Sequence, residues 1–289
     1  MTEELVDWHS HVWLAPHLGN EWGPQLDENV QGRPSEAGDY AAHEAARRAA
    51  GITHSVVVAL TSDLLGLDIP NSFIAEYVAL SDGAIVGFGS VDPNRANAVE
   101  QVIAAASMGL SGIKLSPPYQ GFHPHSEDAW HVYKAAADLG LVLMFHQGGV
   151  FTPRGMLEYA NPVLLDKVAR SFADTRIIIA HMGQPWVNET VALLFKNPNV
   201  FADLSARFSR PWQLRNILFL AMDYGVTGKL LFGSDFPIFD PAACITQFKE
   251  IVDSPTEESR ARHPSLPRIP SAVVDEILSQ RPLSLMGLA

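Results

Sequence analysis

The chain has 289 residues, which is long for an average single domain but close to the about 250 residues of an α/β barrel. Its formal net charge of −12 disfavours nucleic acids and anionic membranes as partners, because both require a basic surface. The single cysteine, Cys244, excludes an internal disulfide and a cysteine-rich zinc site, and no apolar run approaches the roughly 20 residues of a membrane span. With no signal-peptide pattern at the N-terminus, these features predict a cytoplasmic protein.

Short apolar runs, typical of strands buried on both faces, alternate along the chain with helical segments. The predicted strands cover residues 5–13, 55–60, 85–91, 112–116, 141–146, 176–181, 200–205 and 229–233. The predicted helices cover residues 36–51, 72–82, 96–108, 126–139, a segment that starts at 162, and then 187–195, 212–224 and 242–252. Asp39 and Asn161 are expected to cap their helices. Residues 14–35 show no clear period, and so long a connection in a compact domain is usually functional or mobile.

Eight strands, each followed by a helix, predict an α/β fold in the form of a (β/α)8 TIM barrel, a single domain whose barrel covers about residues 4–253. A doubly wound open sheet is the alternative, but no glycine-rich phosphate loop follows the first strand. Residues 254–289 are expected to form a C-terminal helical extension, with a last helix over 272–288 that breaks at Pro282. This extension would pack across the barrel or against a second subunit, as in a homodimer.

The first predicted strand carries two histidines one residue apart. Because side chains alternate between the faces of a strand, Asp7, His9 and His11 are expected to point the same way. A row of buried polar side chains is costly unless it is paired, and a metal ion held between the two imidazoles would pair it.

Polar residues also stand at the carboxyl ends of the later strands, where TIM barrels carry their chemistry. In chain order these are Lys114, His146, His181, Asp203 with Ser205, and Asp235. Each alone has an ordinary explanation, such as a core histidine, a turn cap or a lysine that reaches out of the barrel. Together they favour a divalent metal site, because neutral imidazole and carboxylate suit zinc and similar ions.

The sequence resembles the amidohydrolase superfamily, and within it the amidohydrolase-2 branch, from residue 6 to about 252. The resemblance rests on residues 7–11 (DWHSH), 87–93 (GFGSVDP), 112–115 (GIKL), 145–148 (FHQG), 180–183 (AHMG) and 232–237 (FGSDFP). It implies one divalent metal ion, Zn²⁺ most often and Mn²⁺ sometimes, bound by His9, His11, His146 and Asp235. It also implies that His181 is the catalytic histidine. A second metal held by Lys114, His146 and His181 is the alternative, since a carboxylated lysine bridges two metals in binuclear members.

The substrate is expected to be a small organic anion. Arg207 and Arg210 follow the seventh strand and are the best candidates to bind its carboxylate, because a planar guanidinium matches a carboxylate in two hydrogen bonds. Trp13, Trp186 and Phe236 are expected to form apolar pocket walls. Weaker candidates for substrate contact are His123, His125 and Arg154, while Trp212 is expected to pack at the start of its helix.

The resemblance implies enzymes of two reaction types. In a hydrolase of an ester, lactone or amide, Asp235 would take a proton from a metal-activated water and return it to the leaving group. His181 would stabilise charge on the carbonyl oxygen. In a non-oxidative decarboxylase of a hydroxybenzoate-like or muconate-like acid, Asp235 or His181 would protonate the substrate carbon. The short chain favours the hydrolase narrowly. A non-catalytic metal-binding barrel is the third alternative.

Overall fold

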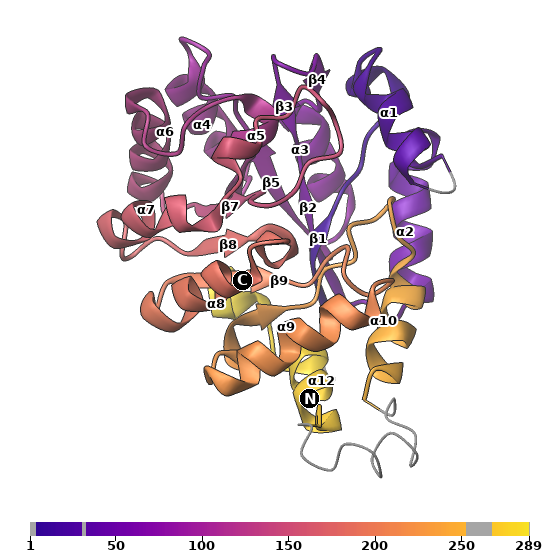
Figure 1. Cartoon of the computed structure of the whole chain (residues 1–289). Coiled ribbons are helices and arrows are strands. Elements are labelled where there is room, and N and C mark those ends of the chain that lie inside the picture. Colours follow the sequence, from indigo (N-terminus) through magenta and orange to yellow (C-terminus); the bar gives the residue numbers. More distant parts are fainter. Residues whose placement is uncertain (1–3, 31–32, 253–267, 289) are drawn as a thin grey trace.

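The computed structural model describes residues 4–30, 33–252 and 268–288, and it confirms the predicted barrel (Figure 1). Eight parallel strands form one sheet in the order β1-β2-β5-β6-β7-β8-β9-β10. Their bounds are β1 Val6–Ser10, β2 His54–Val58, β5 Ile85–Ser90, β6 Gly112–Leu115, β7 Val142–Phe145, β8 Ile177–Ile179, β9 Val200–Asp203 and β10 Leu230–Leu231. The predicted strands extend one to three residues beyond these carboxyl ends.

The sheet closes between β1 and the segment that follows β10. The backbone N–H of Asp235 donates to the His9 carbonyl at 2.8 Å, and the N–H of His11 donates to the Phe236 carbonyl at 2.7 Å. Gly233 permits this approach, because a Cβ at that position would lie 2.8 Å from the Cβ of His9. Closure therefore places the polar end of the first strand directly beside the end of the last.

Helices surround the barrel, as Figure 1 shows. The Asp39 and Asp240 side chains accept backbone N–H groups at the starts of α2 and α10, and Asn161 does so before a 3-10 turn that leads into α7. The helices after the strands are α2 Tyr40–Ala49, α3 Asn71–Leu80, α4 Ala98–Ser107, α6 Glu127–Asp138, α7 Asp166–Ser171, α8 Val187–Lys196, α9 Pro211–Asp223 and α10 Pro241–Glu250. No helix in the described ranges is long and apolar enough to span a bilayer.

Two apolar layers form the core. On β7, Met144 belongs to a cluster inside the barrel, while Leu143 and Phe145 belong to the larger cluster under the helices. After α12 (Ser271–Ser279) the chain breaks at Pro282 as predicted, and a 3-10 turn, Leu283–Met286, packs into the inner cluster. The C-terminal extension thus covers one end of its own barrel. Residues 254–267 of that extension lie outside the described residues.

The segment of residues 14–35, where no period was visible, contains short helical elements. These are η1 Ala15–Leu18, α1 Trp22–Asn29 and η2 Pro34–Glu36. On α1 only Trp22 and Leu26, four residues apart, supply large buried side chains, which is too little to show a helical period. The sequence also did not predict a small hairpin, β3 Thr61–Ser62 with β4 Leu67–Asp68, or the helix α5 Pro117–Gln120. Figure 1 shows α1, β3, β4 and α5 on the opposite side of the barrel from α12.

Candidate metal centre

The first strand is not regular. Asp7 pairs with Ser55 of β2, but Ser10 pairs with Val57, so three steps along β1 match two steps along β2. The extra residue is a β-bulge, which changes the face to which the following side chains point.

This bulge separates Asp7 from the two histidines, so the predicted alignment of all three side chains is wrong. The Asp7 carboxylate accepts from the Ser234 hydroxyl at 2.5 Å and from the Ser234 N–H at 2.9 Å. Burial raises the pKa of Asp7 to about 6, although these hydrogen bonds oppose the rise. Asp7 joins the first strand to the last and does not face the cavity.

His9 and His11 each have one ring nitrogen fixed by an acceptor. His9 Nδ1 lies 2.9 Å from Oδ2 of Asp203, and His11 Nδ1 lies 3.1 Å from the Val58 carbonyl. Since a carboxylate and a carbonyl only accept, both Nδ1 atoms carry hydrogen. In neutral imidazoles this leaves Nε2 as a bare lone pair, and the two Nε2 atoms lie 3.3 Å apart.

Asp235 completes this group. Its Oδ1 lies 3.5 Å from His11 Nε2 and 3.8 Å from His9 Nε2. Burial alone would raise the pKa of this carboxyl, but the imidazole of His181 and those of His9 and His11 hold it below its ordinary value. Asp235 has a left-handed backbone, with φ of 64°, which is uncommon for a residue other than glycine and often marks functional sites.

The donors of His9, His11 and Asp235 fit a divalent cation. Ligands of a tetrahedral ion, each bound at about 2.0–2.2 Å, stand roughly 3.3–3.6 Å apart, close to the separations seen here. Two facing lone pairs and a carboxylate oxygen repel one another unless a positive charge lies beside them. Lys114 Nζ, 3.1 Å from His9 Nε2, supplies one such charge, and a metal ion would supply another. The predicted role of these three residues therefore agrees with the geometry of the site.

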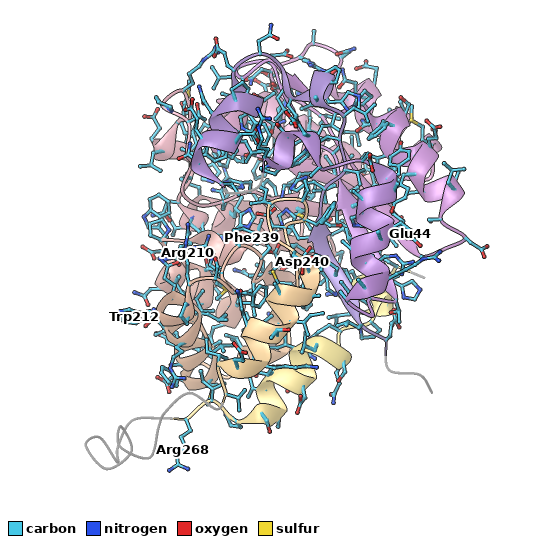
Figure 2. The ribbon with its side chains drawn as sticks, turned by 90° about the vertical axis from the view of Figure 1, so that its right-hand side faces the viewer. Glu44, Arg210, Trp212, Phe239, Asp240 and Arg268 are labelled. Carbon is cyan, nitrogen blue, oxygen red and sulfur yellow. The ribbon has the colours of Figure 1, made fainter. Side chains whose placement is uncertain are left out.

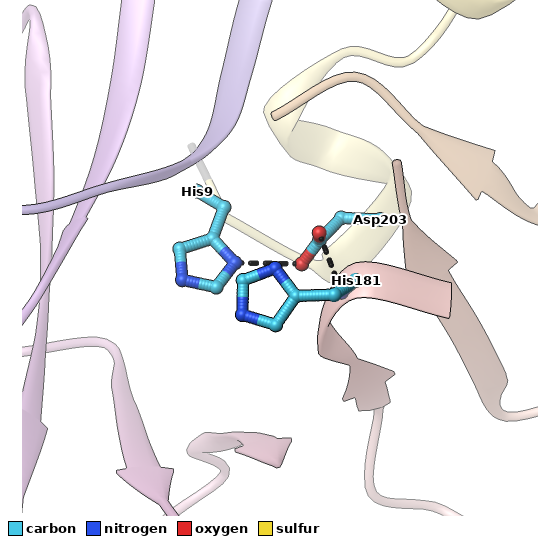
Figure 3. A group of neighbouring side chains, drawn as sticks. All are labelled: His9, His181 and Asp203. Atoms are coloured by element: carbon cyan, nitrogen blue, oxygen red, sulfur yellow. Dashed lines mark hydrogen bonds and ion pairs between the residues drawn. The ribbon is translucent and has the colours of Figure 1, made fainter. Parts of the chain in front are cut away.

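A second cluster contains His9, His181 and Asp203, shown in Figure 3. The rings of His9 and His181 are stacked, with centroids 4.8 Å apart. Asp203 accepts the Nδ1 hydrogen of His9 and, at 3.0 Å, the backbone N–H of His181. These contacts are hydrogen bonds, and a carboxylate behind a ligating histidine orients the ring.

His146 lies in the same cavity but outside the three-donor group. Its Nε2 lies 3.3 Å from the Gly149 carbonyl. Its ring centroid lies 4.9 Å from that of His181 and 4.8 Å from that of Tyr119. His146 as a fourth ligand stays a prediction.

Lys114 is buried at the centre of the barrel. Its Nζ lies 3.1 Å from His9 Nε2 and 3.5 Å from the sulfur of Met144. Burial lowers the pKa of Lys114 to about 8, against the attraction of Asp203 and Asp235. A second metal held by Lys114 and His181 also stays a prediction.

A cavity of about 420 Å³ lies over these residues, and one part of its lining is aromatic. Neighbouring rings along this wall have centroids 4.8–6.1 Å apart, within the range of aromatic contacts. In order of contact, the wall consists of His11, Trp13, Trp22, Phe151, Tyr119 and His146. Of the predicted wall residues, Trp13 is therefore in place.

Arg207 is a buried cation that also lines this cavity. Its Nη1 donates to the Gln213 side chain at 3.0 Å, and its Nε has no hydrogen-bond partner within the described ranges. Burial lowers the pKa of Arg207 to about 10, and the charge of nearby Arg210 adds to this effect. Arg210 and Phe239, both labelled in Figure 2, also line the cavity. The two predicted arginines thus reach the site.

Several other predicted contacts are not among the lining residues. Phe236 follows the inward-facing Asp235 and points the other way, with its ring 5.2 Å from that of His43. Trp186 stands at the start of α8, while Pro185 before it lines the cavity. The prediction for Trp212 is wrong, because 75% of it is exposed, at the molecule's edge in Figure 2.

The weaker candidates for substrate contact also lie outside the lining. Nε2 of His125 lies 2.7 Å from the Leu164 carbonyl, and the His123 ring packs against Tyr159. Arg154 forms an ion pair with Glu21 at 2.8 Å, and both side chains are largely exposed. These contacts give the three side chains a structural role in their loops.

Several residues of the site had no predicted role. Asp203 and Ser205 were visible at the end of a strand, but the sequence does not show which neighbours they contact. Trp22 and Phe239 line the cavity from the segments that follow β1 and β10, and no motif or helical period in those segments marked them for this role.

Comparison with solved structures supports the fold. An uncharacterised TIM-barrel protein from Bordetella bronchiseptica is 18% identical, with a TM-score of 0.74 and 98% of each chain covered. A probable 2-pyrone-4,6-dicarboxylic acid hydrolase from Acinetobacter baumannii is 17% identical, with a TM-score of 0.68 and coverage of 99% of this chain and 100% of that one. A 5-carboxyvanillate decarboxylase from Novosphingobium aromaticivorans, solved with bound manganese, is 12% identical, with a TM-score of 0.65 and coverage of 99% and 97%. At these identities the likeness shows the fold alone.

The sequence itself identifies the family. A search of curated proteins found no match. The sequence model described as amidohydrolase, of the amidohydrolase-2 type, matches residues 6–266, which is most of the chain and includes every metal donor named above. The resemblance seen in the motifs is thereby confirmed, and the chain belongs to the amidohydrolase-2 family.

Proposed function

We propose that this protein is a metal-dependent hydrolase that acts on an ester, lactone or amide of a small organic anion. The observation that supports this most directly is the meeting of His9 Nε2, His11 Nε2 and Asp235 Oδ1 beneath the cavity that holds Arg207. These donors would hold one divalent ion, Zn²⁺ or Mn²⁺. Such an ion supplies Lewis acidity, which polarises a carbonyl and makes water a stronger acid.

Asp235 is the proton acceptor of this proposal. It lines the cavity, and its neighbours keep the carboxyl ionised, so it can take a proton from the attacking water. It then returns this proton to the leaving group. His181 lines the same cavity, with its ring beside those of His9 and His146, and is the second proton-transfer residue.

Arg207 supplies the selectivity for an anion. An acidic protein repels anions at long range, so an anionic substrate needs a fixed cation at the site. A buried guanidinium with free donor capacity can bind a carboxylate and compensate for its own desolvation. The aromatic wall, from Trp13 to Tyr119, would pack against the organic body of the substrate.

A non-oxidative decarboxylase is the second candidate. The aromatic wall suits a planar ring, and the decarboxylase from Novosphingobium aromaticivorans has the same fold. Both reactions use the same donors and the same arginine. They differ in product, because only a decarboxylase releases carbon dioxide.

The test loads the purified protein with Zn²⁺ or Mn²⁺ and measures bound metal by elemental analysis. It then assays a panel of lactones, esters, amides and hydroxybenzoates for acid release and for carbon dioxide. About one equivalent of metal and acid release from an anionic substrate support the hydrolase. Carbon dioxide release would replace it with the decarboxylase. Bound metal without turnover on any class would favour a non-catalytic metal-binding barrel.

A further inference from the structure

Asp203 and Ser205, at the end of β9, contact both histidines of the proposed reaction. Oδ2 of Asp203 lies 2.9 Å from His9 Nδ1. The Ser205 hydroxyl lies 2.7 Å from His181 Nδ1 and 3.2 Å from His9 Nδ1, and it donates to Oδ1 of Asp203. The proposed function gives these contacts their importance, since it assigns His9 to the metal and His181 to proton transfer.

The hydrogens of this network can be assigned one by one. Oδ1 of Asp203 accepts the backbone N–H groups of His181 and Ser205, each at 3.0 Å, so the carboxylate acts as an acceptor. Two oxygen atoms within hydrogen-bond distance must share a hydrogen, and here only the Ser205 hydroxyl has one. The Ser205 hydroxyl therefore donates its single hydrogen to Asp203.

The orientation of Ser205 decides the state of the catalytic histidine. With its hydrogen on Asp203, the Ser205 oxygen can only accept at His181 Nδ1, so that nitrogen carries the hydrogen. His9 Nδ1 faces the same two acceptors and carries its hydrogen there too. In the neutral form, Nε2 of each ring, which is on the far side from β9, is then a bare lone pair.

We propose that Asp203 and Ser205 form a positioning pair that fixes the tautomers of His9 and His181, so that His181 presents a proton-accepting Nε2 to the cavity. A neutral His181 held in this way cannot donate an N–H to a developing oxyanion. It can donate a proton from Nε2 only after accepting one there, and the proton available is the one that Asp235 takes from the attacking water. This replaces the role expected from the sequence, in which His181 stabilises the carbonyl oxygen as a donor.

The decisive measurement is the tautomer of His181 in the metal-free protein. Long-range ¹H–¹⁵N correlation spectra of protein labelled with ¹⁵N-histidine separate the two tautomers, and a His181→Gln variant assigns the signals. The proposal expects the Nδ1–H form in the native protein. In Ser205→Ala it expects loss of this preference, with Ser205→Thr, which keeps the hydroxyl, restoring it.

The matched control is Ser55→Ala on β2. Ser55 is a buried serine whose hydroxyl has no partner in the part of the chain that the structure describes, so its removal should leave the His181 signals unchanged. A native His181 in the Nε2–H form would overturn the proposal, as would identical His181 signals in native protein and Ser205→Ala.

Metal affinity provides a second readout. Asp203→Asn should weaken Zn²⁺ binding by about 10- to 100-fold, the usual effect of losing a partner behind a ligating histidine. Ser205→Ala should weaken it less, because His9 keeps Asp203 as its acceptor. An unchanged affinity in Asp203→Asn would remove His9 from the proposal. If the native protein binds no metal, the proposed function fails, while the tautomer measurement still decides the pairing of Ser205 with His181.

Discussion

The two ends of the barrel interior differ in what they bury. At the end covered by the C-terminal extension, Trp8 packs with Leu283 and Met286, and the Trp8 N–H donates to the Arg281 carbonyl at 3.0 Å. At the other end, His9 and Asp203 are fully buried and Lys114 almost fully, and they pair with one another. One end buries apolar surface, and the other buries charge.

This difference shows which end stabilises the fold and which is adapted to chemistry. Apolar burial contributes about 25 cal/mol per Å², whereas buried charges cost free energy unless they are paired. The polar end also contains four residues other than glycine that have a left-handed backbone conformation, His181, Met182, Ala206 and Asp235. We therefore expect changes at the polar end to affect activity first and changes at the covered end to affect stability first.

The largest expected effect is on catalysis at the polar end. Asp235→Asn keeps the shape of the side chain but removes its proton-accepting oxygen and part of the metal affinity. Loss of the proton-transfer step alone should reduce turnover by about 10²- to 10⁴-fold. The check is kcat on the active substrate together with metal content and the unfolding midpoint. Turnover within threefold of the native value would show that Asp235 is not the proton acceptor.

The next largest expected effect is a loss of stability when a side chain is truncated at the covered end. Met286 is buried against the inner cluster, so Met286→Ala should lower the free energy of unfolding by about 2–5 kcal/mol through lost contacts and the cavity left behind. Urea unfolding measures this loss. Metal affinity and kcat/KM of the folded fraction should stay at the native level. A coupled loss of metal affinity would contradict the separation of the two ends.

Arg207 tests substrate recognition at the polar end. Arg207→Met removes the guanidinium and keeps much of the side-chain volume, so binding of an acid substrate should fall by about 10- to 150-fold, or roughly 1.5–3 kcal/mol. The methyl ester of the same acid lacks the charge and should lose far less. Arg210→Met serves as the comparison, because Arg210 is more exposed. Equal losses on acid and ester would show that Arg207 does not bind the carboxylate.

His43 makes the polar end sensitive to acid. It is buried between the Tyr77 hydroxyl, 2.8 Å away, and the Ser10 hydroxyl, 3.0 Å away. Burial lowers the pKa of His43 to about 3, with Arg47 adding to the effect, from an ordinary 6.5. Below pH 6.5 the His43 imidazole is therefore protonated in the unfolded chain but stays neutral in the folded protein. The free energy of unfolding falls as the pH falls towards 3.

The expected contribution of His43 is a loss of about 2 kcal/mol of unfolding free energy between pH 7.5 and pH 5. Urea unfolding of native protein and His43→Gln at both pH values measures it. The variant should start less stable at pH 7.5 but lose less on acidification. Parallel losses in the two proteins would mean that another group accounts for the pH dependence.

Local patterns in the sequence predicted most of the barrel and most of the residues at its mouth. Strand and helix periods depend on neighbours within a few residues, so alternation alone predicted eight β/α units. The position of His9, His11, His181 and Asp235 at strand ends then followed from the architecture, because the carboxyl ends of parallel strands meet at one end of a barrel.

Tertiary structure decided what local patterns could not show. The bulge in β1 arises from pairing with β2, and it separates Asp7 from His9 although strict alternation would align them. Closure of the sheet at Gly233 brings Asp235 to the two histidines from the other end of the sequence. The tautomer of His181 depends on one hydroxyl of Ser205, whose single hydrogen is used elsewhere. These features depend on contacts between residues far apart in the chain, so a local sequence pattern cannot predict them.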